Sequence, residues 1–228
     1  MMRIDAIERD VVISHIIFAV ICLAVLMVKV NVSVGVKLFH LVVLYDLIIL
    51  SIIMWFKYNE LVDIWVLGFV LSIFMVFPDW FLASQLNAIS FPQTGFFRIG
   101  PVSGYMLGLW TIPVFMILFT GRSMQLRYSR VVTYLFVALV SLVIFALAEQ
   151  FMWTLPSWHA RNVFTIGHIA AYIIIPEVIF GLSAYACYEF IRGKNHWLKV
   201  PCAFGVMLLY LGSASFFYFL IEKVLIRS

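Results

Sequence analysis

Residues 131–153 read VVTYLFVALVSLVIFALAEQFMW, and this stretch decides the fold class because it carries no charge before Glu149. An α-helix rises 1.5 Å per residue, so about 20 apolar residues cross the roughly 30 Å hydrocarbon core of a bilayer. The stretch lacks the alternation of apolar and polar residues that is typical of a barrel strand, and backbone groups cannot be left unpaired in lipid. It therefore predicts a transmembrane α-helix.

The same pattern recurs along the 228 residues, of which 65% are hydrophobic and 11% charged, with a mean hydropathy of +1.10. These values lie outside the range of soluble globular domains. We expect one all-α transmembrane domain over residues 1–228, a seven-helix bundle. The predicted helices are 11–28, 38–56, 61–84, 101–120, 131–153, 165–191 and 200–222. The short connections between them leave no room for a soluble domain.

Lys and Arg residues are spread over all the connecting loops, so the net charge of +4 predicts a topology and not a nucleic-acid partner. A cytoplasmic N-terminus places the larger share of these cations inside, and the C-terminus then lies outside. We expect a multi-pass protein of the cell (inner) membrane, with the lipid bilayer as its partner and the oligomeric state left open. No nucleotide, phosphate or metal motif is found, so no cofactor is expected.

Several ionisable side chains fall inside the apolar runs, where each costs at least ~2.5–3.5 kcal/mol to insert. Asp46 and Glu177 are predicted near the middle of their helices, and Asp79 and Glu149 near the outer ends. Such residues face the bundle interior, where they line a cavity or act in catalysis. The alternatives are an interhelical hydrogen bond for the first two and contact with interfacial water for the other two.

Pro176 directly precedes Glu177 in the segment 173–181, IIIPEVIFG. Proline removes one helical hydrogen bond and clashes with the carbonyl one turn earlier, so we expect a kink that opens space beside the acid. Broken helices at membrane depth are tolerated where they line protein cavities. The segment therefore predicts a cavity with an acid in its wall near the middle of the bilayer.

Aromatic and polar side chains are expected to line the same cavity. Helical spacing puts Trp153 on the face of Glu149, and Tyr172 on the face of His168. The candidates for substrate binding are Trp110, Tyr105, Tyr172, Trp80, Trp153, Asp46 and His168. The alternative for most of the rings is an ordinary lipid-facing or interfacial position, and for the histidine an interfacial hydrogen bond.

Two segments of the chain share a pattern. GPVSGYMLGLW from Gly100 and GHIAAYIIIPE from Gly167 both carry a glycine, a β-branched residue, two small residues and a tyrosine. Each begins a predicted helix that follows an outer aromatic loop. The match predicts two related helical hairpins, made by the third and fourth and by the fifth and sixth helices, and it puts Trp110 at the position of Glu177.

These segments resemble the membrane lycopene-cyclase domain of carotenoid and related terpenoid cyclases, a family with about seven helices and a weak internal repeat. The family motifs are W-D-x-x-A-T, then G-x-W-x-F, then P-x-E-E-x-x-F-F at the head of a helix. Here DWFLAS at 79–84 and PEVIF at 176–180 correspond to them in part, whereas Ser103 and Gly104 stand where the family has two acids. The resemblance covers about half the chain.

The resemblance implies an isomerase that cyclises a hydrophobic isoprenoid or related lipid, with Glu177, Asp79 and Glu149 as its catalytic acids. One carboxylate of each family pair is missing, which argues against lycopene itself as the substrate. Protonation of an isoprenoid double bond needs a carboxylic acid that keeps its proton near neutral pH, and burial favours that state. The carbocation that forms needs a dry pocket lined by aromatic faces. Glu177 is the best placed proton donor.

Two other classes stay open. A small-solute or proton-coupled transporter would use Asp46 and Glu177 to carry protons or to bind a cation. A non-catalytic structural membrane protein would pair all of its acids between helices, with no cavity. A retinal-binding protein is excluded, because residues 200–222 contain no lysine to which retinal could attach.

Overall fold

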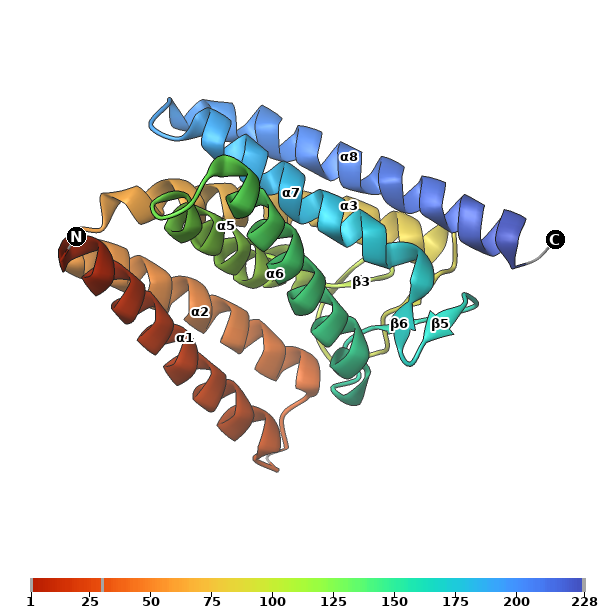
Figure 1. Ribbon diagram of the computed structural model, residues 1–228. Helices are drawn as coiled ribbons and strands as arrows, with labels where there is room; N and C mark the ends of the chain where they lie inside the picture. The colour runs from red at the N-terminus through yellow and green to blue at the C-terminus, as the bar shows by residue number, and fades with distance from the viewer. Residues whose placement is uncertain (1, 30, 227–228) are drawn as a thin grey trace.

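The computed structural model describes residues 2–29 and 31–226, and this part of the chain folds into an all-α bundle (Figure 1). The start of α1 and the end of α8 lie at opposite ends of the bundle. Seven helical segments are long and apolar enough to cross a membrane: Ala6–Met27, Val34–Phe56, Asn59–Ser84, Met106–Gln125, Arg130–Thr154, Ala171–Ile191 and Lys199–Leu225. The protein is therefore a multi-pass membrane protein.

The bundle is built from eight α-helices, with short 3₁₀ turns and strands in the connections. The α-helices are α1 (Met2–Met27), α2 (Val34–Phe56), α3 (Val62–Ser84), α4 (Met106–Leu109), α5 (Thr111–Gln125), α6 (Arg130–Phe151), α7 (Ile174–Ile191) and α8 (Lys199–Tyr218). The 3₁₀ turns are η1 (Asn59–Leu61), η2 (Met152–Thr154), η3 (Ala171–Ile173) and η4 (His196–Leu198), and η5 (Phe219–Leu225) is a π-helix. The strands are β1 (Ile89–Ser90), β2 (Arg98–Ile99), β3 (Val102–Ser103), β4 (His159–Ala160), β5 (Thr165–Ile166) and β6 (Ile169–Ala170).

Serine caps fix the start of two long helices. The Ser33 hydroxyl accepts the N–H of Val36 at 3.4 Å ahead of α2, and the Ser129 hydroxyl accepts the N–H of Val132 at 3.5 Å ahead of α6. Each bond satisfies one of the N–H groups that have no partner inside the helix. Short polar connections thus set the helix ends, while the apolar runs set the helix lengths.

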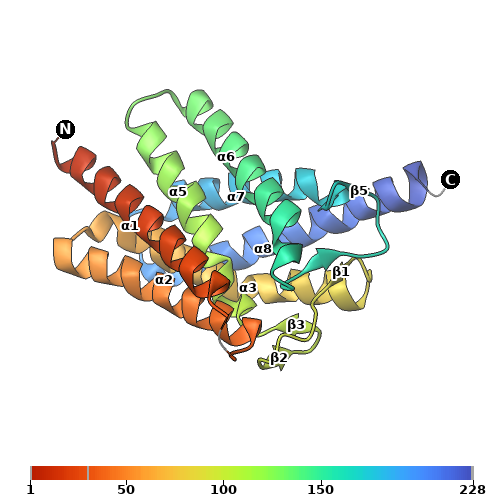
Figure 2. The same cartoon turned by 90° about the horizontal axis from the view of Figure 1, so that it is seen from below.

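The predicted internal repeat is present as two hairpins of the same form. The β2–β3 hairpin turns at Gly100 (φ 58°) and the β5–β6 hairpin at Gly167 (φ 65°), backbone conformations that glycine adopts without strain. Each hairpin follows a long helix, α3 or α6, and leads into the next one. Strand β1 pairs with β4, with Ile89 opposite Ala160, and so joins the loops of the two halves. We call the end of the bundle that carries these strands the hairpin end (Figure 2).

The hairpins shorten two predicted helices. The segment predicted at 101–120 is helical only from Met106, and the segment predicted at 165–191 only from Ala171. The reason is the glycine turn in each, which directs the chain into a strand pair before the helix begins. Apolar character alone does not distinguish these residues from helix.

The expectation of a kink in the middle of a helix at Pro176 is wrong. Pro176 is the third residue of α7, and Glu177 also lies in the first turn. Proline is tolerated there, because the N–H groups of a first turn have no acceptor inside the helix. Glu177 therefore lies at the hairpin end, the same end as Asp79 and Glu149, and not halfway along its helix.

Charged contacts join the helices at the opposite end, which we call the ion-pair end. Three of its ion pairs among the described residues are Arg127–Glu8 at 2.6 Å, Arg122–Glu60 at 2.5 Å and Lys199–Asp63 at 2.7 Å. They connect α1 to the loop after α5, α5 to η1, and α8 to α3. The Lys199 side chain is 0% exposed and that of Asp63 is 16% exposed, so the buried charge of the lysine is balanced by a half-buried carboxylate.

The helices α6 and α7 pack closely at Gly181. A methyl group added there would lie 2.7 Å from the Cβ of Ser141 and closer still to its hydroxyl. We expect Gly181→Ala to lower the free energy of unfolding by about 1–3 kcal/mol, as overpacking does, measured by denaturation in detergent micelles. Gly205→Ala is the matched control, since nothing lies near an added methyl group there. Ser141→Gly should restore most of the loss, and equal stability of both alanine variants would contradict the close contact.

Candidate functional site

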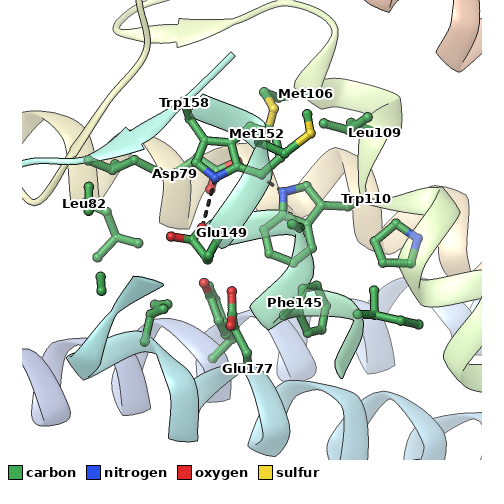
Figure 3. Close-up of a pocket in the computed structure, with 18 of the residues that line it drawn as sticks. Asp79, Leu82, Met106, Leu109, Trp110, Phe145, Glu149, Met152, Trp158 and Glu177 are labelled. Atoms are coloured by element: carbon green, nitrogen blue, oxygen red, sulfur yellow. Dashed lines mark hydrogen bonds between the residues drawn. The ribbon is translucent and has the colours of Figure 1, made fainter. Parts of the chain in front are cut away.

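Three acids from three helices meet at one cavity at the hairpin end (Figure 3). They are Asp79 of α3, Glu149 of α6 and Glu177 of α7, the acids that the sequence predicts to share a pocket. The cavity has a volume of about 230 Å³, and the rest of its lining is almost wholly apolar or aromatic. Carboxyl groups in such surroundings are costly to bury, which makes the cavity the strongest candidate for a functional site.

Indole groups hold two of the three acids. Trp110 donates its Nε1–H to Asp79 Oδ2 at 3.2 Å, and Trp158 donates its Nε1–H to Glu149 Oε1 at 2.8 Å. An indole nitrogen can only donate, so Asp79 Oδ2 and Glu149 Oε1 are the acceptors in these two bonds. The two carboxyl groups are thereby fixed in orientation as acceptors.

Glu177 differs from the other two acids. Its side chain is buried at 5% exposure and points toward Glu149 (Figure 3). Among residues 2–29 and 31–226 no side chain or backbone group forms a hydrogen bond with it. Its oxygens are not among the fully enclosed polar atoms that lack a partner, and the residue lines the cavity, so a ligand or water there can bond to the carboxyl group. Glu177 is the acid free to interact with a ligand in the cavity.

Aromatic rings form the wall beside the acids. The ring centroid of Trp110 lies 5.4 Å from those of Phe145 and Phe180 and 5.9 Å from that of Tyr210. Trp110, Phe145 and Tyr210 line the cavity directly. The faces of such rings attract positive charge, so this wall suits a cationic ligand or intermediate.

The two halves of the repeat contribute unequally to the cavity. Trp110 follows the first hairpin at the place that Glu177 takes after the second, as the sequence match predicts. The first half therefore supplies one acid and an indole, Asp79 with Trp110. The second half supplies two acids, Glu149 and Glu177, and one indole, that of Trp158.

Two predicted cavity residues lie outside it. Trp153 and His168 stack on each other at the surface, with ring centroids 4.3 Å apart. Trp153 is in the 3₁₀ turn η2, which takes it off the α-helical face of Glu149, and His168 is in the turn of the β5–β6 hairpin and not in a helix. The helical spacing used to place both residues does not apply there.

Three further candidates have other positions. Asp46 accepts the indole N–H of Trp65 at 3.0 Å and does not line the cavity, which agrees with the alternative of an interhelical hydrogen bond. The ring of Trp80 covers Gly100, and 41% of this residue is exposed. Tyr105 lies just behind the lining with its hydroxyl 2.7 Å from Ser157 Oγ, and burial raises the pKa of this phenol. Tyr172 lines the cavity as predicted.

Sequence reasoning missed three lining residues that matter for the site: Phe145, Trp158 and Tyr210. Phe145 precedes Glu149 by four residues, so helical spacing could have identified it. Trp158 lies in the loop after α6, where the sequence indicates only an interfacial aromatic residue. Tyr210 lies in α8 with no acid beside it, and no local signal marks it.

A family model described as a domain of unknown function (DUF6989) matches residues 76–221. The match contains every residue that lines the cavity, from Asp79 to Tyr210, and leaves out α1 and α2. No curated protein and no solved structure matches the chain.

Proposed function

The chain belongs to the DUF6989 family, and we propose that its acid cavity is the active site of a membrane-embedded terpenoid- or carotenoid-type cyclase or of a related lipid-modifying enzyme. Glu177 is the observation that carries the proposal: a buried carboxyl group, without a hydrogen-bond partner among the described residues, that projects into an apolar cavity. The partial resemblance to membrane lycopene cyclases supports the same reaction class. The proposal includes a cytoplasmic N-terminus, which puts the acids near the outer face of the cell (inner) membrane.

In this proposal Glu177 starts the reaction as a carboxylic acid. It gives its proton to one carbon of an isoprenoid double bond, and the π electrons form the new C–H bond. The other carbon becomes a tertiary carbocation, and Glu177 is left as a carboxylate. A second double bond of the same chain then attacks the cation, which closes a ring and moves the positive charge along the chain.

Asp79 or Glu149 completes the reaction as a base. The carboxylate removes a proton from a carbon beside the cation, and the electrons of that C–H bond form a new double bond. One proton is gained and one is lost, so the reaction is an isomerisation that needs no oxidant or reductant. Glu149 is the acid toward which Glu177 points, so it is the better placed base. After the product has left, the base gives its proton to water and Glu177 takes up a proton from water, which restores both groups for the next turnover.

The cavity wall protects the cation between these two steps. Trp110, Phe145 and Tyr210 present aromatic rings to it, and ring faces stabilise a nearby positive charge by about 0.5–2 kcal/mol each. The apolar lining also excludes water. Water would otherwise add to the cation and give an alcohol. The expected product is therefore a cyclic hydrocarbon skeleton with no added hydroxyl group.

Deuterium incorporation tests the proposal directly. Membranes from a host that makes isoprenoids from farnesyl to carotenoid length are incubated in heavy water, with and without the protein. We expect a new cyclic isomer that carries one deuterium on the carbon that received the proton, because the proton of Glu177 exchanges with solvent between turnovers. Identical lipid profiles with and without the protein would overturn the proposal, as would a cyclic product without deuterium.

Transport of a cationic lipophilic solute is the second candidate, because three acids and aromatic faces in one cavity would also bind a cation. The same incubation separates the two functions. A transporter leaves the lipid profile unchanged and moves a lipophilic cation such as tetraphenylphosphonium into sealed vesicles. The cyclase changes the lipid profile and does not move the cation.

A further inference from the structure

We propose that the substrate enters the cavity sideways from the bilayer, between α5 and α6, as the apolar chain of a lipid longer than the cavity. Only its terminal unit reaches the acids, and the remainder stays in the membrane. The reaction at that unit rests on the proposed function, whereas the route of entry rests on the walls of the cavity.

The walls differ in exposure. The residues contributed by α3, α7 and α8 are buried, among them Leu82, Glu177 and Tyr210. The residues contributed by α5 and the second half of α6 are mostly half-buried, and Met116 of α5 is 36% exposed, the highest value in the lining. The most exposed residue of the cavity wall therefore lies on the side of α5 and α6, where we place the opening.

Both edges of this opening are apolar. Ile144, Ala148 and Met152 recur every fourth residue, so the first two share one face of α6 and the third extends that row into η2. The edge on α5 is made by Ile112, Pro113 and Met116. We call the region between these two rows, where the proposed entry lies, the α5–α6 slit. An opening edged only by apolar side chains, in the side of a transmembrane bundle, admits hydrocarbon and not a hydrated solute.

The end of the cavity that faces the loops is covered. Strands β1 and β4 pair across it, and the N–H of Arg161 donates to the carbonyl of Ala88 at 2.9 Å. Beneath them the hydroxyl of Tyr105 bonds to Ser157, which is fully buried, and the indole of Trp158 is bonded to Glu149. A route through the loops would have to break these hydrogen bonds, whereas the slit requires only that apolar side chains move.

The size of the cavity sets the kind of substrate. Its volume of about 230 Å³ is below the range of roughly 300–1,000 Å³ that encloses a drug-sized ligand. A whole carotenoid or other long isoprenoid does not fit, but one end of it does. The substrate class is thus defined by its terminal unit and by a flexible apolar tail, with little selection on tail length.

Photolabelling measures the route without requiring turnover. Purified protein in phosphatidylcholine vesicles is irradiated with a farnesol analogue that carries a diazirine on its terminal isoprene unit, and the labelled residues are mapped by mass spectrometry. We expect labels on cavity residues such as Trp110 and Phe145 and on Met116 in the slit. Wild-type protein labelled on its lipid-facing side chains alone would overturn the inference.

A bulky residue in the slit is expected to block entry. Ala148 has the smallest side chain on either edge, so Ala148→Trp should reduce cavity labels by on the order of tenfold or more, because an indole fills space that the lipid needs. Leu147→Trp is the matched control one position along, where the side chain faces lipid at 53% exposure, and it should keep the wild-type labelling. Met116→Trp on the facing helix is a second blocking variant, which tests the route independently if Ala148→Trp does not fold.

The outcomes separate this inference from the proposed function. Undiminished cavity labels in both blocking variants would overturn entry through the slit. Cavity labelling that is lost in both variants and kept in Leu147→Trp supports the slit, even if no cyclic product is ever found. A cyclic product that forms equally well in both blocking variants would support the proposed function and contradict entry through the slit.

Discussion

Replacing Glu177 with glutamine is expected to lower product formation by about 10²- to 10⁴-fold, the range that general acids contribute. The amide of glutamine has nearly the same size and shape as the carboxyl group but cannot give up a proton to a double bond. Glu177 has no hydrogen-bond partner among the described residues, so the substitution breaks no hydrogen bond of the fold. The rate is measured as the deuterated cyclic product formed per unit of protein in membranes.

Two further variants make this result specific. Asp46→Asn changes an acid that lies in the membrane but outside the cavity, and its amide oxygen can still accept from Trp65, so its rate should equal that of the wild type. Glu177→Asp keeps the acid but shortens the side chain by one methylene group, which withdraws the acid from the cavity. Its rate should lie between those of the wild type and of Glu177→Gln. If Glu177→Gln retained the full rate, Glu177 could not be the proton donor.

Replacing Asp63 with alanine is expected to lower the free energy of unfolding by about 3–5 kcal/mol, because it removes a carboxylate that pairs with the buried ammonium group of Lys199. Asp63 lies 2.7 Å from the Nζ of Lys199, which is fully buried, and it also accepts the N–H of Gly193 at 3.0 Å. The substitution thus weakens both the contact between α3 and α8 and the connection that leads into α8. Denaturation in mixed micelles, followed by circular dichroism, measures the loss.

The control for Asp63→Ala is an ion pair at the surface. Arg130 lies 3.1 Å from Glu189 but its side chain is 75% exposed, so Arg130→Ala should change stability far less. The double variant Asp63→Ala, Lys199→Met should recover much of the loss, since it removes both charges together. Similar stability of Asp63→Ala and Arg130→Ala would show that the buried pair contributes little.

The fold class and most helices could be predicted from the sequence, because a bilayer demands about 20 apolar residues per helix and this chain meets the demand seven times. The predicted segment 131–153 lies within the helical segment Arg130–Thr154. The segments predicted to begin at 101 and 165 are wrong at their starts, because no Asp, Glu, Lys or Arg separates residues 101–105 and 165–170 from the helices that follow them. The match between these segments was the better guide, since it placed both glycines in register.

The site was predicted in part. Acids are costly inside apolar segments, so Asp79, Glu149 and Glu177 could be predicted as candidates from their positions in the sequence. The structure brings these three together at one cavity. Trp158 could not be predicted, because its contact with Glu149 depends on how the loop after α6 folds back. Asp46 carries the same signal as the other acids and also accepts from an indole, that of Trp65, but only the structure shows that it lies outside the cavity.

The separation between each acid and its indole donor has a consequence for synthesis of the chain. Asp79 and Trp110 are 31 residues apart and belong to the first half, whereas Glu149 and Trp158 are 9 residues apart and belong to the second. The first half can therefore complete its own pair before the second half is made, and the pair of the second half needs no residue of the first. Pairing in the order of synthesis shortens the time that a carboxyl group spends without a donor in the bilayer, where it is costly. Glu177 is translated after all four residues of these pairs.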